Sequence, residues 1–269
     1  MSIQILLILI FNFIITLIGT LAYSTRLVGV RTGKIAISFT VFNILTLISR
    51  TAVTFQEPLL TNYAEKNLYS SNLLNVFNII ILVSGIASVL GVILIPTFQR
   101  MFSKGVLFFS VEKSIPKLIV HSITRRGIRS MKQCAVLPSK ESVKKIDYRR
   151  LPRKIVLYNF ISVAVLTVGA LAPIYAFKMV PNLRATCVTL SSVVNGIAQI
   201  LMTIFIDPAM SIMTEEVIEK KCREEDFKNC VTAMALSKVA GTFAAIILLI
   251  PASFTIVYAA KGVDFISRI

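Results

Sequence analysis

The sequence predicts an all-α polytopic membrane protein, and three observations lead to this fold class. Of the 269 residues, 55% are hydrophobic and only 16% are charged, and the mean hydropathy is +0.79. Soluble domains contain about 45–50% apolar and about 25% charged residues, so an ordinary soluble domain is excluded. A bilayer-spanning helix needs about 20 mostly apolar residues. Six stretches meet this length, at residues 2–23, 35–56, 73–99, 155–177, 185–206 and 239–260.

The first span, residues 2–23, is predicted to be a true membrane helix rather than a signal peptide. It has no basic segment before its apolar core. The core is also longer than the roughly 7–15 apolar residues of a signal peptide. Only helices and closed barrels satisfy the backbone within lipid, so each further span is also predicted to be a helix.

The distribution of Lys and Arg predicts the orientation of the spans. Arg26, Arg31 and Lys34 follow the first span, and residues 100–154 contain fifteen basic and three acidic residues. The link after the second span holds one base, Lys66. Because cytoplasmic loops are enriched in Lys and Arg, both basic segments are predicted to be cytoplasmic. The prediction is a multi-pass plasma-membrane protein with both termini extracellular.

The basic segment 101–153 alternates apolar clusters with bases. Phe108, Phe109 and Ile115 belong to an apolar side, and Pro116 would break it into short helices. This pattern favours amphipathic helices that lie in the membrane interface, although the charge alone could simply set the topology. The segment 211–237 is also charged and is predicted to be a cytoplasmic helix with a solvated face.

The formal net charge of +16 requires an explanation in terms of partners. Most of the bases lie beside spans, in segment 101–153 and after the first span, rather than on a separate globular domain. Nucleic acid is therefore not an expected partner. Anionic lipid headgroups attract juxtamembrane bases and are the expected partner instead.

A faint internal repeat divides the spans into two sets of three. Residues 55–58 (FQEP) and 205–208 (FIDP) are 150 positions apart, and residues 19–22 lie over 169–172 at the same offset. Because each set has an odd number of spans, the chain enters the membrane from opposite sides in the two sets. This is the arrangement of inverted-repeat transporters. The predicted division is a first three-span repeat at 1–100, the basic segment at 101–153, and a second three-span repeat at 154–269 that includes the helix 211–237.

Each repeat contains an acidic residue followed by proline. In the inverted arrangement Glu57 would cap the second span at the outer face, and Asp207 would cap the fifth span at the inner face, as two related gates. The alternative is that the proline merely stops each helix, because the residue before a proline disfavours helix. Pro96 and Pro251 are likewise expected to kink or end the third and sixth spans.

Arg50 is the most prominent polar residue, because it lies well inside the second span. An ionisable group at this depth is a functional hypothesis by default, and a guanidinium suits phosphate through its bidentate fork. Glu57 lies seven residues on and shares its helix face. The alternatives are an Arg50 that lines a cavity and meets an anion, and an Arg50 that snorkels to the interface or pairs structurally with Glu57.

Other polar and small residues within or beside the spans extend the candidate site. Asn side chains in the spans either bind neighbouring helices together or line a cavity. Gly85, Gly91 and Gly241 indicate close helix packing. The candidate substrate-binding or translocation residues are Arg50, Glu57, Asp207, Arg26, Arg31, Lys34, Arg184, Asn43 and Asn195.

No enzyme signature is found in the sequence. There is no phosphate-binding glycine loop and no HExxH, and the one histidine, His121, cannot supply a Ser–His–Asp set. The four cysteines form no CxxC pair and no cluster with histidine, so no metal site is indicated. We therefore predict no catalytic residue, no metal and no cofactor.

One stretch of the sequence resembles the bacterial Amj family, whose name stands for alternate to MurJ. The resemblance is carried by residues 22–34 (AYSTRLVGVRTGK), by the pairs at 42–43 and 49–50, and by residues 56–60 (QEPLL). Length, number of spans and the long basic segment agree with it. The resemblance implies a lipid II flippase of the bacterial cell membrane, which moves undecaprenyl-pyrophosphate-linked disaccharide-pentapeptide to the outer leaflet.

Two other functions stay open at this point. The chain could be an ion-coupled transporter of a small anionic solute, with a closed cavity rather than a groove that faces lipid. It could also be a scaffold that transports nothing and recruits partners or anionic lipid through its basic segment. A homodimer is also left open.

Overall fold

The structure is a computed structural model that describes residues 3–67, 72–112, 124, 134, 136 and 152–266. The elements in these residues are all helices, and six helical segments are long and apolar enough to cross a membrane. The predicted fold class is therefore confirmed. The helices are α1 (Ile3–Leu21), α2 (Tyr23–Thr32), α3 (Ile35–Lys66), α4 (Leu73–Glu112), α8 (Arg153–Met179), η1 (Pro181–Leu183), α9 (Arg184–Leu201), the π-helix η2 (Met202–Ile206), α10 (Asp207–Ile218) and α11 (Glu224–Ile266).

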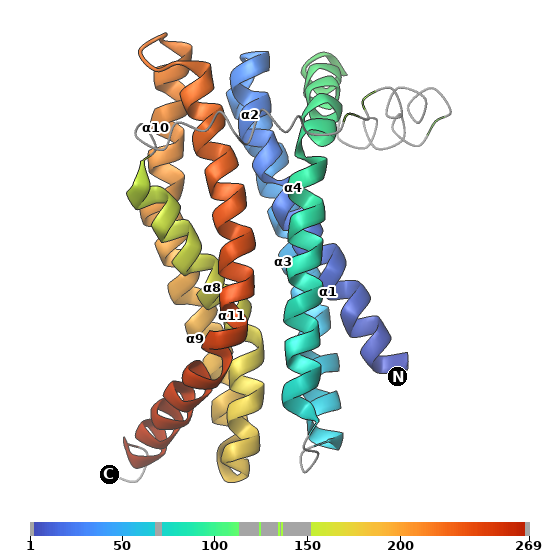
Figure 1. Ribbon diagram of the computed structural model, residues 1–269, viewed down its shortest axis with the longest axis vertical. Coiled ribbons are helices and arrows are strands. Elements are labelled where there is room, and N and C mark those ends of the chain that lie inside the picture. Colours follow the sequence, from blue (N-terminus) through green and yellow to red (C-terminus); the bar gives the residue numbers. More distant parts are fainter. Residues whose placement is uncertain are drawn as a thin grey trace.

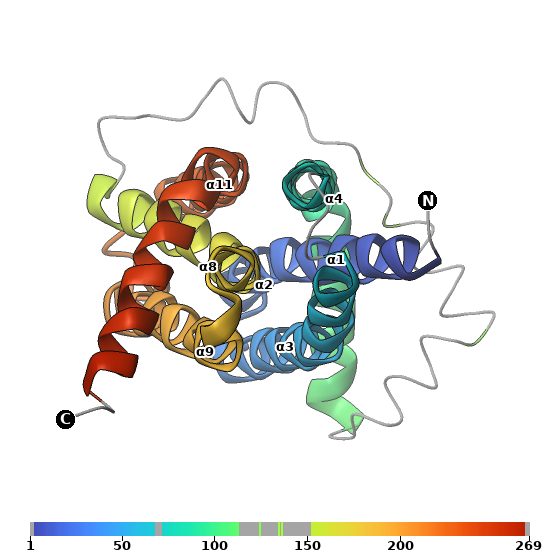
Figure 2. The same ribbon diagram turned by 90° about the horizontal axis from the view of Figure 1, so that it is seen from below.

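The helices form two groups of three spans (Figures 1 and 2). We call α1–α4 the first half and α8–α11 the second half. In the first half α1 packs against both α3 and α4, and in the second half α8 packs against both α9 and α11. The link between α2 and α3 and the turn between α10 and α11 lie at one end of the molecule (Figure 1), which we call the basic end. The C-terminal end of α3, the start of α4 and the α8–α9 connection lie at the opposite end.

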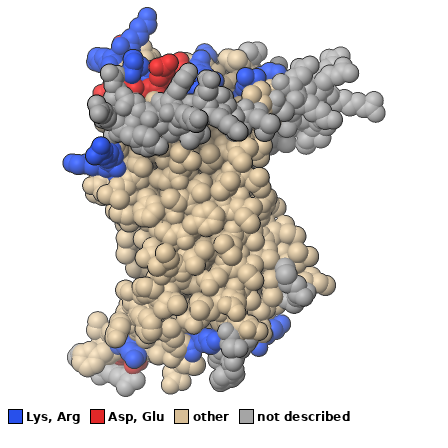
Figure 3. All heavy atoms as spheres, viewed as in Figure 1, with Lys and Arg blue, Asp and Glu red and all other residues tan. Residues whose placement is uncertain are grey.

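The surface between the two ends is apolar. Large side chains such as Ile247, Leu47 and Ile204 are exposed over 78%, 65% and 59% of their area. In Figure 3 uncharged residues form a broad band, and the charged side chains gather above and below it. Soluble proteins rarely expose apolar patches of this extent, so this band is the surface that faces lipid.

A continuous apolar core joins the halves toward the opposite end. It is built from buried residues of α1, α3, α4, α8, α9 and α11, with Phe77 and Tyr175 in edge-to-face contact across the halves at 6.3 Å. A second, smaller cluster is centred on Phe227, Met210 and Met234 of the second half and includes Leu27 of the first half.

The first span changes direction at Ala22, between α1 and α2 (Figure 1). The buried hydroxyls of Ser24 and Thr25 donate to the carbonyls of Leu21 and Ala22 at 2.6 and 2.7 Å, and Thr20 donates to Thr16. Hydroxyls that donate to the preceding turn bend helices. The Tyr-Ser-Thr-Arg stretch therefore sets the angle of α2, which ends at Gly33 with a left-handed φ of 65°.

Pro58, Pro96 and Pro251 do not end their helices, which leaves the kink that was the other expectation for Pro96 and Pro251. α3 continues through Pro58 to Lys66, α4 through Pro96 to Glu112, and α11 through Pro251 to Ile266. Within packed membrane helices the freed backbone groups are satisfied locally, and proline is tolerated. Figure 1 shows α11 turning aside in its C-terminal part, which agrees with a kink rather than an end.

Pro208 is accommodated by a π-helical turn. Its ring would collide with the carbonyl four residues earlier in a regular α-helix. The backbone N–H of Asp207 instead donates to the carbonyl of Met202, five residues earlier. Such π-turns frequently occur at functional sites, and this one places Asp207 at the start of α10.

Close helix packing at the three glycines is confirmed. A Cβ atom at Gly85 would lie 2.4 Å from the ring of Phe243, and one at Gly91 would lie 2.6 Å from the Cβ of Thr20. At Gly241 the nearest atom would be the carbonyl oxygen of Phe160, at 2.7 Å. Any larger side chain would push these helices apart.

Two predicted segments differ from the structure. The segment 211–237 is not a single helix, because α10 ends at Ile218 and α11 begins at Glu224. The turn between them contains Lys220 with a positive φ of 59°. The first residues of segment 101–153 continue α4 as far as Glu112, and the interfacial helices predicted beyond lie outside the described residues.

Candidate functional site

Polar and ionic contacts connect the two halves from one end of the molecule to the other, and we call this set the polar seam. Its residues in the first half are Tyr23, Arg26, Arg31, Arg50 and Glu65, and those in the second half are Asn159, Arg184, Gln199, Asp207, Glu224 and Lys238. Within the spans, the polar side chains that make these contacts face another helix instead of lipid. The seam is therefore the part of the fold where a hydrophilic group could pass between the halves.

The strongest contact of the seam is the ion pair between Arg26 and Asp207. The Arg26 guanidinium donates to the Asp207 carboxylate at 2.5 Å, and the two side chains are only 14% and 29% exposed. The guanidinium also lies 4.9 Å from the ring centre of Phe42, within cation–π range. Its Nε is buried and has no hydrogen-bond partner among the described residues. This nitrogen is left able to donate to an incoming anion.

A second ion pair lies nearer the basic end. The Nε of Arg31 donates to the carboxylate of Glu224 at 3.2 Å, and both side chains are about half exposed. Arg31 lies in the last turn of α2, and Glu224 is the first residue of α11. The two ion pairs therefore tie α2 to both arms of the α10–α11 turn.

A buried hydrogen-bond network around Asn159 also belongs to the seam. The Tyr23 hydroxyl donates to Asn159 Oδ1 at 2.7 Å, and Asn159 Nδ2 donates to Ser237 Oγ at 2.7 Å and to the Met234 carbonyl at 2.9 Å. Asn side chains in the spans were expected either to bind neighbouring helices together or to line a cavity, and Asn159 of the fourth span does the former. Here it links α2, α8 and α11.

Lys238 is one of several seam residues that the sequence interpretation did not include among its candidates. Its ammonium lies 5.7 Å from the ring centre of Tyr23, and a Cβ at Gly19 would lie 3.0 Å from its nitrogen. The predicted sixth span began at residue 239, one residue too late to include it. Extending the helical pattern of α11 back to its acidic first turn would have placed Lys238 inside the helix.

Arg50 crosses the seam near its middle. Its guanidinium donates to the side-chain oxygen of Gln199 in α9, and Gln199 in turn donates to Thr203 at 3.1 Å. The expected pairing of Arg50 with Glu57 is not formed, and Glu57 is half-buried. Arg50 itself is exposed, so its partner is a neutral amide that a stronger acceptor can replace.

At the end opposite the basic end, Arg184 forms an ion pair with Glu65. Their nitrogen and oxygen lie 3.2 Å apart, and the guanidinium lies 5.6 Å from the ring centre of Phe177. Arg184 is the first residue of α9, and Glu65 is in the last turn of α3. The seam therefore carries ion pairs between the halves at both of its ends.

The other candidate residues lie apart from these contacts. Lys34 and Asn43 are exposed, and their side chains make no hydrogen bond or ion pair with the described residues. Asn195 is half-buried, and its side-chain oxygen has no hydrogen-bond partner there. A Cβ at Gly169 would lie 2.3 Å from this oxygen, which therefore fits only against glycine.

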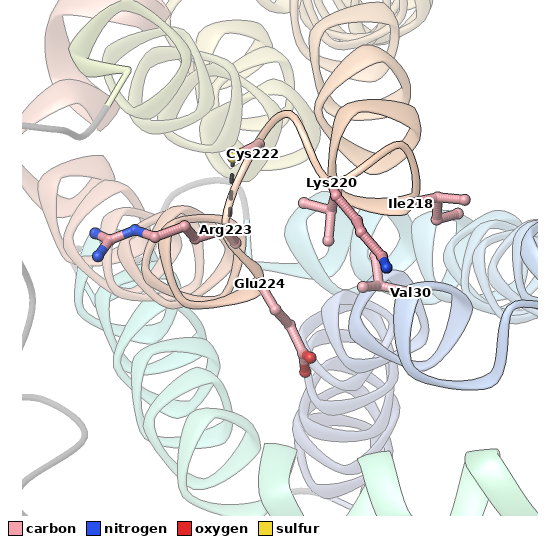
Figure 4. A pocket seen from close by; sticks show the side chains of 7 residues that line it. Val30, Ile218, Lys220, Cys222, Arg223 and Glu224 are labelled. Carbon is pink, nitrogen blue, oxygen red and sulfur yellow. Dashed lines mark hydrogen bonds between the residues drawn. The ribbon is translucent and has the colours of Figure 1, made fainter.

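A hollow of about 360 Å³ lies at the basic end of the seam (Figure 4). Its lining includes Val30, Ile218, Lys220 and Glu224, which come from α2 and from the α10–α11 turn. Cys222 also borders it, and burial together with the carboxylates of Asp226 and Glu216 raises the pKa of this thiol. The described residues contain no group of three or more His, Cys, Asp or Glu suited to a metal ion.

Comparison with known proteins identifies the family. The family model described as Amj, alternate to MurJ, matches residues 11–260. The chain is 31% identical over 262 residues to the protein named lipid II flippase Amj of Bacillus subtilis (strain 168), and the match covers 96% of this chain and 97% of that protein. No solved structure matches the chain. The chain therefore belongs to the Amj family.

Proposed function

We propose that this chain is a lipid II flippase, which moves undecaprenyl-pyrophosphate-linked disaccharide-pentapeptide from the inner to the outer leaflet of the bacterial cell membrane. Its relative in Bacillus subtilis is named for this activity, and the similarity covers nearly the whole of both chains. The structural observation that carries the proposal is the presence of Arg26, Arg50 and Lys238 along the polar seam. Cations at membrane depth offer an anionic headgroup a path between the halves.

The division into two halves supports alternating access as the mechanism. The first span of each half packs against the other two spans of that half, which is the arrangement expected of an inverted repeat. Arg26–Asp207 and Arg31–Glu224 tie the halves at the basic end, and Arg184–Glu65 ties them at the other end. Breaking one set while the other holds would open the seam to one side at a time. Rocking of repeats about a central site is the usual transporter mechanism.

No chemical step on the substrate is part of this proposal. The headgroup moves through the seam while the prenyl chain stays in lipid beside the apolar band. Anionic lipids at the basic end are proposed as further partners, because bases next to a membrane surface contribute about 1 kcal/mol each.

We expect the basic end to face the cytoplasm, as the positive-inside rule requires. Glu225→Cys, at the start of α11, should react with a membrane-impermeant thiol reagent only after the cells are opened. Lys66→Cys, at the end of α3, should react in intact cells. The four native cysteines are first replaced, so that only the introduced thiol is labelled. Labelling of position 225 from outside would contradict this orientation and the extracellular termini.

The proposed activity is tested by expression in a strain depleted of its main lipid II flippase. Growth should be restored, and lipid II should become accessible to an impermeant probe at the outer leaflet. An ion-coupled transporter of small anions would not expose lipid II. A scaffold would restore neither growth nor lipid II exposure. If the protein accumulates normally, the result expected of the transporter or of the scaffold would overturn the proposal.

A further inference from the structure

Lys238 has an environment that neither the family nor the ion pairs of the seam explain. It is the fifteenth residue of α11, so it lies about 20 Å along the helix from the charged turn at the basic end. Arg26, Arg31 and Arg184 each have a carboxylate partner in the other half. Within the described part of the chain, the Lys238 ammonium has no carboxylate partner and donates no hydrogen bond.

The surroundings of Lys238 leave space for its ammonium. Gly19 of α1 lies close to the Lys238 nitrogen. A Cβ atom built on Gly19 would lie 3.0 Å from this nitrogen and 3.9 Å from Ser49 Oγ. The ring of Tyr23 covers the ammonium, with 5.7 Å from the nitrogen to the ring centre. The Tyr23 hydroxyl is fixed by Asn159, which also holds Ser237, the residue before Lys238. The side chain is thus positioned by α1, α2 and α8.

Two other cations lie on the helices that border Lys238. Arg26 is three residues after Tyr23 on the same face of α2, and Arg50 directly follows Ser49 in α3. Arg26 has a buried, unpartnered Nε, and the partner of Arg50 is a neutral amide. An unpaired ammonium away from water is costly, unless an anion from outside the chain pairs with it. Lys238 is partly exposed, so an anion that enters the seam can approach its side chain.

We infer that Lys238 is a binding site for the diphosphate group of the transported lipid, held in its position by Gly19 and Tyr23. This inference rests on the proposed function and names the residue that meets the headgroup. The ammonium supplies a point charge to one phosphate, and the guanidinium groups of Arg26 and Arg50 can donate to the other oxygens. The lysine forms no ion pair with the residues that the structure describes, so its charge is available for the ligand.

The inference is tested with full-length protein in zwitterionic nanodiscs, titrated with undecaprenyl diphosphate. Lys238→Met keeps the length of the side chain and removes its charge, so binding should weaken by about tenfold or more, the usual effect of losing a charged hydrogen bond. Lys238→Arg should recover most of the affinity. Gly19→Val keeps the charge but occupies the space of the ammonium, and it should also weaken binding. Lys261→Met, an exposed position on the same helix, is the matched control and should bind as the wild type does.

Further ligands separate the sources of the signal. Undecaprenol, which has no phosphate, should bind Lys238→Met and the wild type equally. Free inorganic pyrophosphate should bind more weakly than the lipid and should be just as sensitive to Lys238→Met. The melting temperature of ligand-free Lys238→Met should equal or exceed that of the wild type, because the change removes an unpaired charge. Equal binding of undecaprenyl diphosphate by Lys238→Met and the wild type would overturn the inference. A lower melting temperature without recovery in Lys238→Arg would overturn it as well.

Failure of the inference can be distinguished from failure of the proposed function. If the wild type restores growth and binds the diphosphate lipid but Lys238→Met binds equally well, only the site is wrong. If the wild type binds the lipid through Lys238 but exposes no lipid II in cells, the flippase function is wrong and the site stands. If the wild type does neither, both are wrong.

Discussion

Asp207→Ala is expected to destabilise the protein by about 3 kcal/mol, the lower end of the range for breaking a buried ion pair. The change leaves the Arg26 guanidinium, which is only 14% exposed, without its carboxylate. The cation–π contact with Phe42 cannot replace it, since such contacts contribute about 0.5–2 kcal/mol. Unfolding followed by denaturant in detergent, and abundance in the membrane, measure this loss.

A double variant separates folding from transport at the same pair. Arg26→Met combined with Asp207→Leu removes both charges, and buried ion pairs replaced by apolar side chains of similar volume are often neutral or more stable. We expect stability close to that of the wild type but no exposure of lipid II, because the ion pair that opens and closes the basic end is gone. Asp207→Ala with unchanged stability, or a double variant that transports normally, would argue against a gate at this pair.

Arg50→Ala is expected to abolish lipid II exposure while leaving the abundance of the protein near normal. Arg50 is exposed, and its bond among the described residues is to the neutral Gln199, so its removal leaves no buried charge unpaired there. However, the change removes the planar guanidinium group, which can bind two phosphate oxygens at once. Arg50→Lys should restore exposure only in part, because the ammonium keeps the charge without the bidentate geometry.

Gln199→Ala is the control for the Arg50 prediction. It removes the resting partner of Arg50 in α9 and keeps the guanidinium, so transport should persist at a reduced rate. Growth of the depleted strain on Arg50→Ala would exclude a role in binding the substrate. Failure of Arg50→Ala to accumulate would instead assign Arg50 a structural role between α3 and α9.

The sequence predicted the spans well because their apolar length is a local property. It misplaced several of their ends, because packed membrane helices tolerate proline. Pro58 was expected to end the second span, but α3 runs to Lys66 and thereby brings Glu65 to Arg184. The sixth span was predicted to begin at 239, whereas α11 begins at Glu224 and includes Lys238.

The partners of the charged residues could not be predicted from local pattern. Arg26 and Asp207 were both candidates, yet 181 positions separate them in the chain, and only the packing of the two halves makes them a pair. Arg50 had a nearby acid on its own helix face in Glu57, but helix packing placed Gln199 of the other half closer. The inverted repeat, with Glu57 related to Asp207, stays a prediction.

The central claim is that lipid II crosses the membrane through the polar seam as the halves separate at one end and then the other. It is tested most directly in vesicles that contain lipid II and a variant with its native cysteines replaced and with Glu65→Cys and Arg184→Cys. A reducible thiol cross-linker joins these two positions across the end opposite the basic end. We predict that lipid II becomes accessible at the far leaflet before cross-linking, that cross-linking stops this transfer, and that reduction restores it. Transfer that continues at the same rate in the cross-linked protein would contradict passage through the seam.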